Sequence, residues 1–232
     1  RERGHELAGI RLDSGDLAYL SIEARKMLDA AGFANARIAA SNDLDEHIIT
    51  SLKLQGARVD VWGVGTRLVT AFDQPALGGV YKLTAIRKEG ADWEYKIKLS
   101  EQLIKISNPG ILQVRRFVDG GRAIGDMIFS EDGQTPTRTI VDPLDRTRRK
   151  DFDGAAAAED LLVPIFRGGT RVYDPPPLDA VRARREQQLA LFHGGIKRLV
   201  HPHRYPVGLE RQLFELKTRL VLEARGSQNR SG

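Results

Sequence analysis

The sequence predicts an α/β fold over its first third, followed by an antiparallel β segment and a helical tail. Short apolar runs alternate with helical patterns between residues 9 and 66, which is typical of parallel βα units. Later β-rich runs are separated by the turn signals "KEGAD" and "SNPG". We therefore divide the chain into residues 1–78 (βα units), 79–177 (a β-rich segment with irregular loops) and 178–232 (a basic helical tail).

The first βα unit has a strand around Ile10 and Leu12 and a helix that ends near Gly32. The apolar residues that recur at helical spacing are Leu17, Leu20, Ala24 and Leu28. The second strand, "ARIAAS", ends at Ser41, and Asn42 or Asp43 is predicted to cap a helix that Gly56 ends. The third strand is "VDVWG". Three such units are too few to close a barrel or complete a sheet, so we expect further strands upstream of them.

The β segment is predicted from the runs "GVYKLTAI", "WEYKIKLS" and "GILQVRRFV", with "RAIGDMIFSEDG" as a strand pair or a bulged strand. Residues 130–160 are polar and rich in turn formers, which predicts weak order, and "DLLVPIFRGG" predicts a further strand. Residues 178–192 and 207–224 have helical patterns on either side of the loop "HPHRYP".

Composition narrows the function classes. The chain has 232 residues, no cysteine and a net charge of +5. It is long enough for a real core, and it has neither a disulfide framework nor an apolar run that could span a membrane. The tail holds 11 Lys and Arg against 5 Asp and Glu. A solvated helix face explains this better than a nucleic-acid surface, because the basic residues are spread out and few aromatic residues accompany them.

Polar or glycine residues follow each of the three predicted strands, and the carboxyl edge of such strands is where α/β folds build active sites. Asp16, Asp43 and Asp45 are explained as helix caps. Asp13 is not, because it lies at the very end of its strand, so it is a candidate functional carboxylate. The sequence "WGVGT" is a glycine turn whose backbone N–H groups and Thr66 hydroxyl are suited to a phosphate.

The segments "GIRLDSGDL", "SNDLDE" and "VDVWGVGTRLVTAFDQPALGGVYKL" occur in this order and spacing, and together they resemble nicotinate phosphoribosyltransferases. "KISNPGILQVRRF" and "HPHRYPVGLERQLFELK" resemble the same family, so the resemblance covers residues 8 to 222, as the C-terminal half of the enzyme. It implies the last βα units of an incomplete TIM-like barrel of the type II phosphoribosyltransferase kind, in a cytoplasmic enzyme of NAD biosynthesis.

The resemblance also implies a reaction and a set of site residues. The family joins nicotinate to phosphoribosyl pyrophosphate, forming nicotinate mononucleotide and pyrophosphate with coupled ATP hydrolysis, and Mg²⁺ accompanies the polyphosphates. Arg11 and Asp13 are expected to face the ribosyl group as the catalytic pair. The residues expected to bind substrate are Ser41, Asn42, Gly63, Gly65 and Thr66. No protein metal site is expected. A homodimer and the N-terminal half of the same enzyme are the expected partners.

One feature of the family has no counterpart in this chain. The family uses a histidine that ATP phosphorylates, in a loop upstream of the "RLDSGD" strand, and none of the five histidines fits that position. We therefore expect the chain alone to be inactive. The alternatives are a phosphoribosyltransferase that uses nicotinamide or quinolinate, a catalytically silent fragment that binds phosphoribosyl ligands or a partner subunit, and a nucleic-acid binder that acts through the basic tail.

Overall fold

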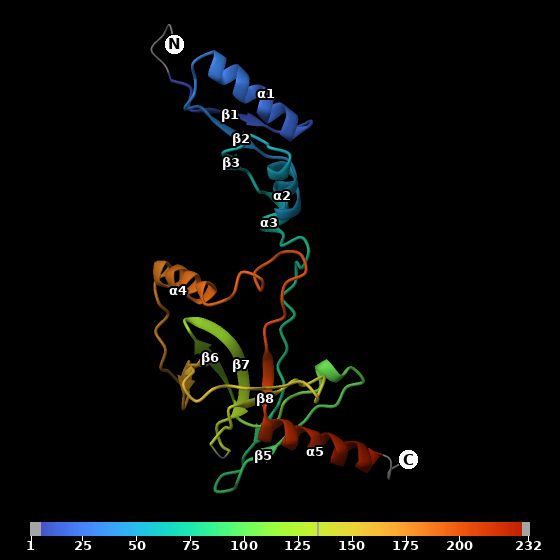
Figure 1. The fold of residues 1–232 in the computed structure, drawn as a ribbon. Helices are drawn as coiled ribbons and strands as arrows, with labels where there is room; N and C mark the ends of the chain where they lie inside the picture. Colours follow the sequence, from blue (N-terminus) through green and yellow to red (C-terminus); the bar gives the residue numbers. More distant parts are fainter. Residues whose placement is uncertain (1–5, 134, 229–232) are drawn as a thin grey trace. The chain divides into compact units, whose positions relative to one another are not determined.

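The computed structural model describes residues 6–133 and 135–228 and divides the chain into two units, residues 1–80 and 81–232 (Figure 1). Unit 1 confirms the predicted alternation of strands and helices, because its three strands form a parallel sheet in the order β1-β2-β3. Its elements are β1 (Gly9–Leu12), α1 (Leu17–Ala30), β2 (Arg37–Ala40), α2 (Glu46–Leu54), β3 (Val61–Trp62) and α3 (Thr66–Val69).

The core of unit 1 lies between its sheet and its first two helices. Leu17 and Ala18 of α1 pack with Ala40 of β2 and Leu52 of α2, and all four are buried. The buried Ser21 donates a hydrogen bond to the Ala18 carbonyl and accepts one from the backbone N–H of Arg58. That hydroxyl therefore links α1 to the chain that leads into β3, without leaving a buried polar group unpaired.

The helix ends of unit 1 follow local chemistry. Asp16 caps α1 by accepting a hydrogen bond from the Tyr19 N–H at 3.0 Å, as predicted. Asp45, which was also expected to be a helix cap, caps α2 by accepting from the Ile48 N–H at 2.8 Å, so the alternative cap at Asn42 or Asp43 was wrong. Asn42 and Asp43 instead have φ values of 106° and 43°. They turn the chain between β2 and α2, a conformation that these two residue types tolerate better than most.

Unit 2 contains a mixed six-stranded sheet in the order β10-β6-β7-β13-β8-β9. Its strands are β6 (Leu112–Asp119), β7 (Arg122–Ser130), β8 (Thr139–Val141), β9 (Arg149–Asp151), β10 (Ala157–Asp160) and β13 (Val207–Glu210). β13 runs parallel to β7 and antiparallel to β8. The strands within residues 79–177 pair antiparallel, as predicted, and the parallel pairing comes from β13, in the tail that was predicted to be helical. Residues 130–160, predicted to be weakly ordered, supply three of the six strands.

The sheet is held together by apolar residues on β6, β7 and β8 and just after β9. Phe117, Met127, Phe129, Ile140 and Phe152 form its buried cluster, and the rings of Phe117 and Phe152 stack with centroids 4.0 Å apart. "RAIGDMIFS" is one strand, and the register of its pairing with β6 shifts between Phe117 and Val118.

The remaining elements of unit 2 are short strand pairs and helices. They are β4 (Ala85–Ile86), β5 (Glu94–Tyr95), a 3-10 turn at Leu103–Lys105, β11 (Phe166–Arg167), β12 (Thr170–Arg171), α4 (Leu178–Ala190) and α5 (Arg211–Gln228). β4 pairs with β5, and β11 with β12, over two residues of each strand. The strand runs predicted at residues 79–86 and 93–100 are thus paired only at these positions.

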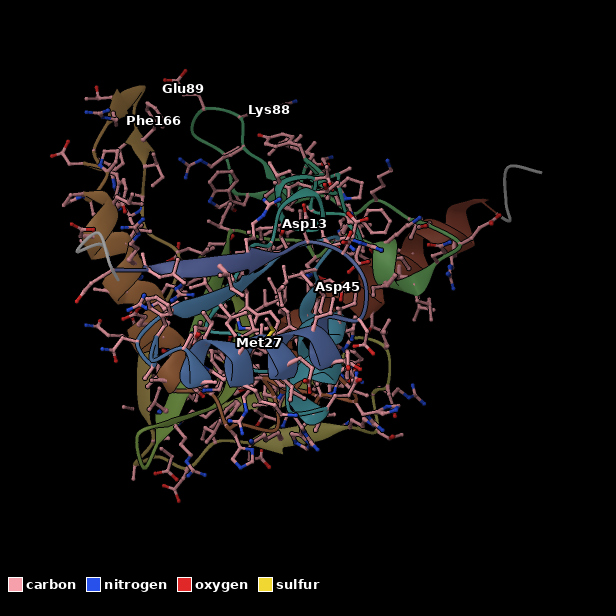
Figure 2. The ribbon with its side chains drawn as sticks, turned by 90° about the horizontal axis from the view of Figure 1, so that it is seen from above. Asp13, Met27, Asp45, Lys88, Glu89 and Phe166 are labelled. Carbon is pink, nitrogen blue, oxygen red and sulfur yellow. The ribbon has the colours of Figure 1, made fainter. Side chains whose placement is uncertain are left out.

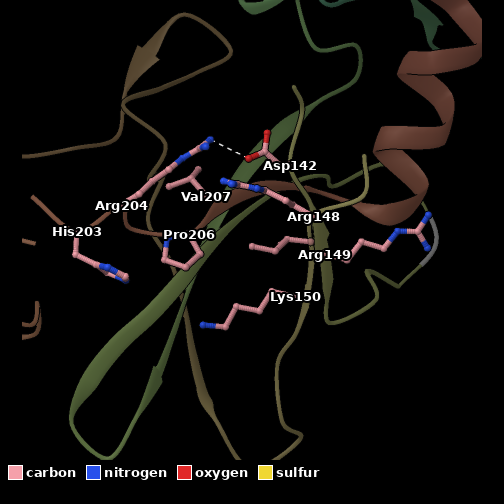
Figure 3. Close-up of a pocket in the computed structure, with 9 residues that line it drawn as sticks. Asp142, Arg148, Arg149, Lys150, His203, Arg204, Pro206 and Val207 are labelled. Carbon is pink, nitrogen blue, oxygen red and sulfur yellow. Dashed lines mark hydrogen bonds and ion pairs between the residues drawn. The ribbon is translucent and has the colours of Figure 1, made fainter. Parts of the chain in front are cut away.

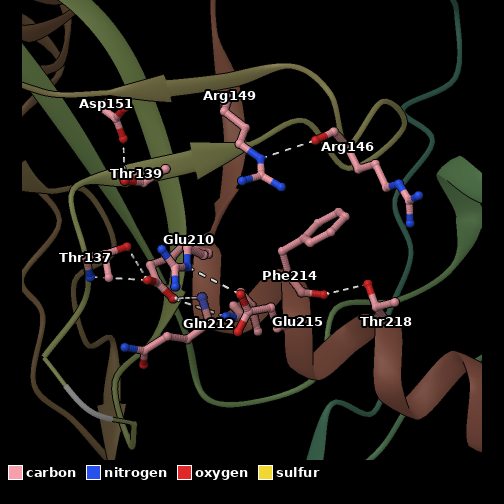
Figure 4. A network of polar contacts seen from close by, with 12 residues as sticks. Thr137, Thr139, Arg146, Arg149, Asp151, Glu210, Gln212, Phe214, Glu215 and Thr218 are labelled. Carbon is pink, nitrogen blue, oxygen red and sulfur yellow. Dashed lines mark hydrogen bonds and ion pairs between the residues drawn. The ribbon is translucent and has the colours of Figure 1, made fainter.

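The helix predicted from residue 207 begins four residues later, because residues 207–210 are β13. The buried Glu210 explains the transition (Figure 4). One of its carboxylate oxygens accepts hydrogen bonds from the N–H groups of Gln212 and Leu213, in the first turn of α5. The other accepts from the Thr137 N–H and hydroxyl. Glu210 therefore caps α5 and fixes it to the segment that precedes β8.

Candidate active-site edge

The carboxyl ends of the three parallel strands lie in one row. Leu12 pairs in register with Ala40, and Ala40 with Trp62, at the last position of each strand. The next residue along each strand is Asp13, Ser41 or Gly63. Three of the residues predicted from sequence to line a site therefore occupy equivalent positions at one edge of the sheet.

Asp13 is in contact with residues from two strands. Arg11, two residues earlier on β1, places Nη2 2.5 Å from Asp13 Oδ2. The Ser41 hydroxyl donates a hydrogen bond to Asp13 Oδ1 at 3.1 Å. Figure 2 shows Asp13 at the end of β1, and more than half of its side chain is exposed. The carboxylate is thus held by its neighbours and is still accessible to a ligand.

Gly63 allows β2 and β3 to end close together. Its N–H donates a hydrogen bond to the Ala40 carbonyl at 2.8 Å, which extends the pairing by one residue. A Cβ atom at position 63 would lie 3.2 Å from Cβ of Ser41. A larger residue would therefore crowd the hydroxyl that contacts Asp13.

The other predicted residues lie near this edge without joining the contact. Gly65 precedes α3, and a Cβ atom there would meet no atom within 4 Å. Thr66 is the first residue of that four-residue helix. Asn42 follows Ser41 with an exposed side chain and a left-handed backbone. The geometry therefore joins Arg11, Asp13 and Ser41 directly.

The histidines lie elsewhere. His47 lies in α2, and His5 is outside the described residues. Within residues 6–133 and 135–228, no group of three or more His, Cys, Asp or Glu side chains could hold a metal ion. Over the same residues, no helix is both long and apolar enough to cross a membrane. Sequence reasoning gave no role to His203, which lines a pocket in unit 2.

Comparison with known proteins shows which family the chain belongs to. The chain is 43% identical to the nicotinate phosphoribosyltransferase of Bacillus subtilis, over 94% of this chain and 45% of the relative. It is 35% identical to nicotinate phosphoribosyltransferase 2 of Arabidopsis thaliana, over 91% of this chain and 40% of the relative. The family model described as the nicotinate phosphoribosyltransferase C-terminal domain matches residues 112–217. The chain belongs to the nicotinate phosphoribosyltransferase family and corresponds to roughly the C-terminal half of its relatives.

A solved structure supports the same relationship. The crystal structure of human nicotinic acid phosphoribosyltransferase matches 92% of this chain with a TM-score of 0.65 and 26% sequence identity. The match covers 40% of the human chain. The present chain therefore spans less than half the length of these relatives. The residues matched by the C-terminal domain model all lie in unit 2, whereas the strand-end row lies in unit 1.

Proposed function

We propose that this chain supplies part of the phosphoribosyl pyrophosphate site of a nicotinate phosphoribosyltransferase. In the proposed reaction the enzyme forms nicotinate mononucleotide and pyrophosphate, with coupled ATP hydrolysis. The observation that carries the proposal is the contact of Arg11, Asp13 and Ser41 at the carboxyl edge of a parallel sheet. Family membership suggests that this contact faces phosphoribosyl pyrophosphate. The names of the relatives favour nicotinate, rather than nicotinamide or quinolinate, as the second substrate.

Asp13 is suited to stabilise the reacting sugar. When pyrophosphate leaves the anomeric carbon, positive charge develops on the ribose ring, and a carboxylate held in place stabilises that charge or binds the ribose hydroxyls. Arg11 and Ser41 hold the two oxygens of Asp13, so little reorganisation is needed when substrate binds. The Arg11 guanidinium also has further N–H donors for a phosphate or carboxylate.

The turn from Gly63 to Thr66 is proposed to hold the 5′-phosphate. It begins at the same sheet edge as Asp13, because Gly63 follows the last residue of β3. The absence of a side chain at Gly65 leaves open space beside the backbone. A phosphate could approach the N–H groups of this turn and the Thr66 hydroxyl. Asn42 is proposed to line the same edge beside Ser41.

The proposed reaction also requires Mg²⁺ and ATP. Mg²⁺ is usually held by phosphate oxygens, waters and one or two carboxylates, and it neutralises the charge of the leaving pyrophosphate. The histidine that receives phosphate from ATP, the remaining strands of the barrel and a second subunit are proposed to come from outside this chain. We place the enzyme in the cytoplasm.

A double-mutant cycle tests the proposed site. Asp13→Asn, Ser41→Ala and the double variant would be made in an enzyme that joins this chain to its N-terminal part, and kcat/KM for phosphoribosyl pyrophosphate would be measured. Because the two side chains are in contact, we expect the double variant to lose less activity than the product of the single losses. Purely additive losses, or wild-type activity in all three variants, would contradict a shared role.

A further inference from the structure

Unit 2 contains a pocket of about 410 Å³ that the proposed function does not use (Figure 3). Three stretches of chain form it. The first is β8, the second is the turn before β9 together with β9, and the third is residues 203–207, which run from the "HPHRYP" loop into β13. We call it the β8–β9 pocket. Its lining side chains are Ile140, Asp142, Arg148, Arg149 and Lys150, joined by His203, Arg204, Pro206 and Val207.

The β8–β9 pocket carries a positive charge. Arg148, Lys150 and Arg204 line it, whereas Asp142 is its one lining carboxylate. Asp145, in the turn just beyond, forms an ion pair with Arg148 at 3.4 Å. Hydrogen bonds from Thr147 are the main cause that lowers the pKa of Asp145, and the charges of Arg148 and Arg204 lower it further. The two arginines therefore produce a positive field that stabilises negative charge beside the pocket.

Protein contacts hold the cationic side chains of the pocket in place but use only some of their N–H donors. Arg204 bonds at 2.8 Å to Asp142, whose side chain is 12% exposed while that of Arg204 is 64% exposed. Lys150 donates one hydrogen bond to the Ile124 carbonyl. A guanidinium has five N–H donors and an ammonium three. Each group therefore has the capacity to bind a further anion without giving up its protein partner.

The loop that carries His203 and Arg204 is fixed at both ends. The His203 N–H donates to the Gly195 carbonyl at 2.8 Å, and the Tyr205 hydroxyl donates to the buried Asp126 at 2.8 Å. His201 has a φ of 47°, which is an uncommon conformation for a residue other than glycine. Such strain persists where surrounding contacts impose it, and it is often found at binding sites.

The pocket also has an apolar wall, because Ile140, Pro206 and Val207 line it together with the cations. Inorganic phosphate would use the positive groups alone, whereas a larger ligand would also cover this wall. We propose that the β8–β9 pocket binds a phosphomonoester whose organic part packs on the apolar wall, with a mononucleotide as the model compound. Every lining residue belongs to unit 2, so this site is separate in sequence from Asp13 and its neighbours.

The test measures binding of AMP, adenosine and inorganic phosphate to the 232-residue chain by calorimetry. Arg148→Gln is the test variant, because the side chain is mostly exposed and its loss should not impair folding. Arg149→Gln is the matched control, since it removes the same charge from the next residue and its guanidinium points away from the other cations in Figure 3. We expect AMP to bind more tightly than either smaller compound, with about 10-fold loss in the Arg148 variant and less than about 2-fold loss in the control.

Two further variants test the apolar wall of the pocket and distinguish the pocket from the proposed phosphate turn of unit 1. Val207→Glu adds a negative charge to the apolar wall, and we expect it to weaken AMP binding even if the arginine variant is poorly folded. Gly65→Val changes only the proposed phosphate turn of unit 1 and should leave AMP binding to the pocket unchanged. The proposal is overturned if AMP binds no better than inorganic phosphate, if Arg148→Gln and Arg149→Gln are equally weakened, or if only Gly65→Val loses binding. None of these results depends on the formation of nicotinate mononucleotide.

Discussion

The Ser41 hydroxyl donates a hydrogen bond to Asp13 across the carboxyl ends of two neighbouring parallel strands, although 28 positions separate the residues in the chain. The parallel register places them opposite each other, one residue beyond Ala40 and Leu12. This contact joins two separate sequence observations, a carboxylate without a capping role and a polar strand end, in one candidate site. It also selects Asp13 for the first experiment.

We expect Asp13→Asn to reduce turnover by about 10² to 10³ in the enzyme that contains this chain, because a preorganised charge is lost from the reacting centre. Folding should change little, since the side chain is more than half exposed. The measurement is the rate of nicotinate mononucleotide formation, with circular dichroism to follow unfolding. Asp16→Asn is the control, because asparagine caps a helix as well as aspartate does. Wild-type turnover in the Asp13 variant would remove this residue from the mechanism.

Gly65→Val should weaken the binding of phosphoribosyl pyrophosphate and affect ATP hydrolysis less. The new side chain has room in the structure, because nothing lies within 4 Å of its Cβ position. It should therefore fold and still keep a phosphate away from the backbone N–H groups. Calorimetric titration measures the affinity. Gly154→Val, which is equally unhindered, controls for added bulk. An unchanged affinity in the Gly65 variant would mean that the turn has a structural role alone.

The sequence predicts the features that depend on nearby residues and misses those that depend on residues distant in the chain. The cap at Asp16 and the stop at Gly32, which has a φ of 77°, depend on nearby residues and were predicted correctly. β13 was missed because its residues continue the helical spacing of α5. Its strand form depends on pairing with β7 and β8, which are distant in sequence. There Gly208 allows close approach, since a Cβ atom would lie 2.8 Å from the Val141 carbonyl oxygen.

The strands between residues 130 and 160 were missed for a related reason. β10 is an edge strand whose four residues are all exposed, so it lacks the alternation that identifies a half-buried strand. Its place is fixed by β6, where Arg115 forms two hydrogen bonds with Asp160. For the candidate site, the sequence predicted Arg11, Asp13 and Ser41, and the structure brings these three side chains into contact. The sequence did not predict the β8–β9 pocket, because residues 140–150 and 203–207 are distant in the chain and come together through the pairing of β13 with β8.

The unfolding free energy is expected to fall as the pH rises above 10, partly through Tyr205. Burial, followed by the hydrogen bond to Asp126 and the charge of that group, raises the pKa of this phenol well above its usual value of 10.0. Above pH 10 the unfolded chain releases the Tyr205 proton while the folded chain retains it. The unfolded state then binds fewer protons, so the stability decreases with increasing pH.

Tyr205→Phe tests this linkage. The variant should lower stability at pH 7 by about 1 kcal/mol through the lost hydrogen bond, and its stability should fall less steeply between pH 10 and 11. Urea unfolding at several pH values measures both effects. Tyr81→Phe is the control, because the Tyr81 side chain is fully exposed. Equal pH slopes for wild type and Tyr205→Phe would show that this phenol does not contribute to the alkaline loss of stability.

The 232-residue chain alone is expected to form no nicotinate mononucleotide. Its parallel sheet has three strands, and it matches 45% of the Bacillus subtilis relative. A barrel-type pocket takes residues from the ends of several strands, so most of the substrate contacts would have to come from elsewhere. The apolar side chains of Leu68, Val69 and Leu77 are also largely exposed in unit 1, which favours a further protein surface that covers them.

Complementation provides the measurement. Purified chain would be assayed for nicotinate mononucleotide with ATP, nicotinate and phosphoribosyl pyrophosphate, with and without a separately produced N-terminal part of the same enzyme. We expect product only from the mixture, because the added strands would complete the sheet edge that begins with Asp13. The mixture made with Asp13→Asn serves as the control and should form the complex without comparable activity. ATP-stimulated turnover by the isolated chain would refute the prediction and direct attention to the histidines that it contains.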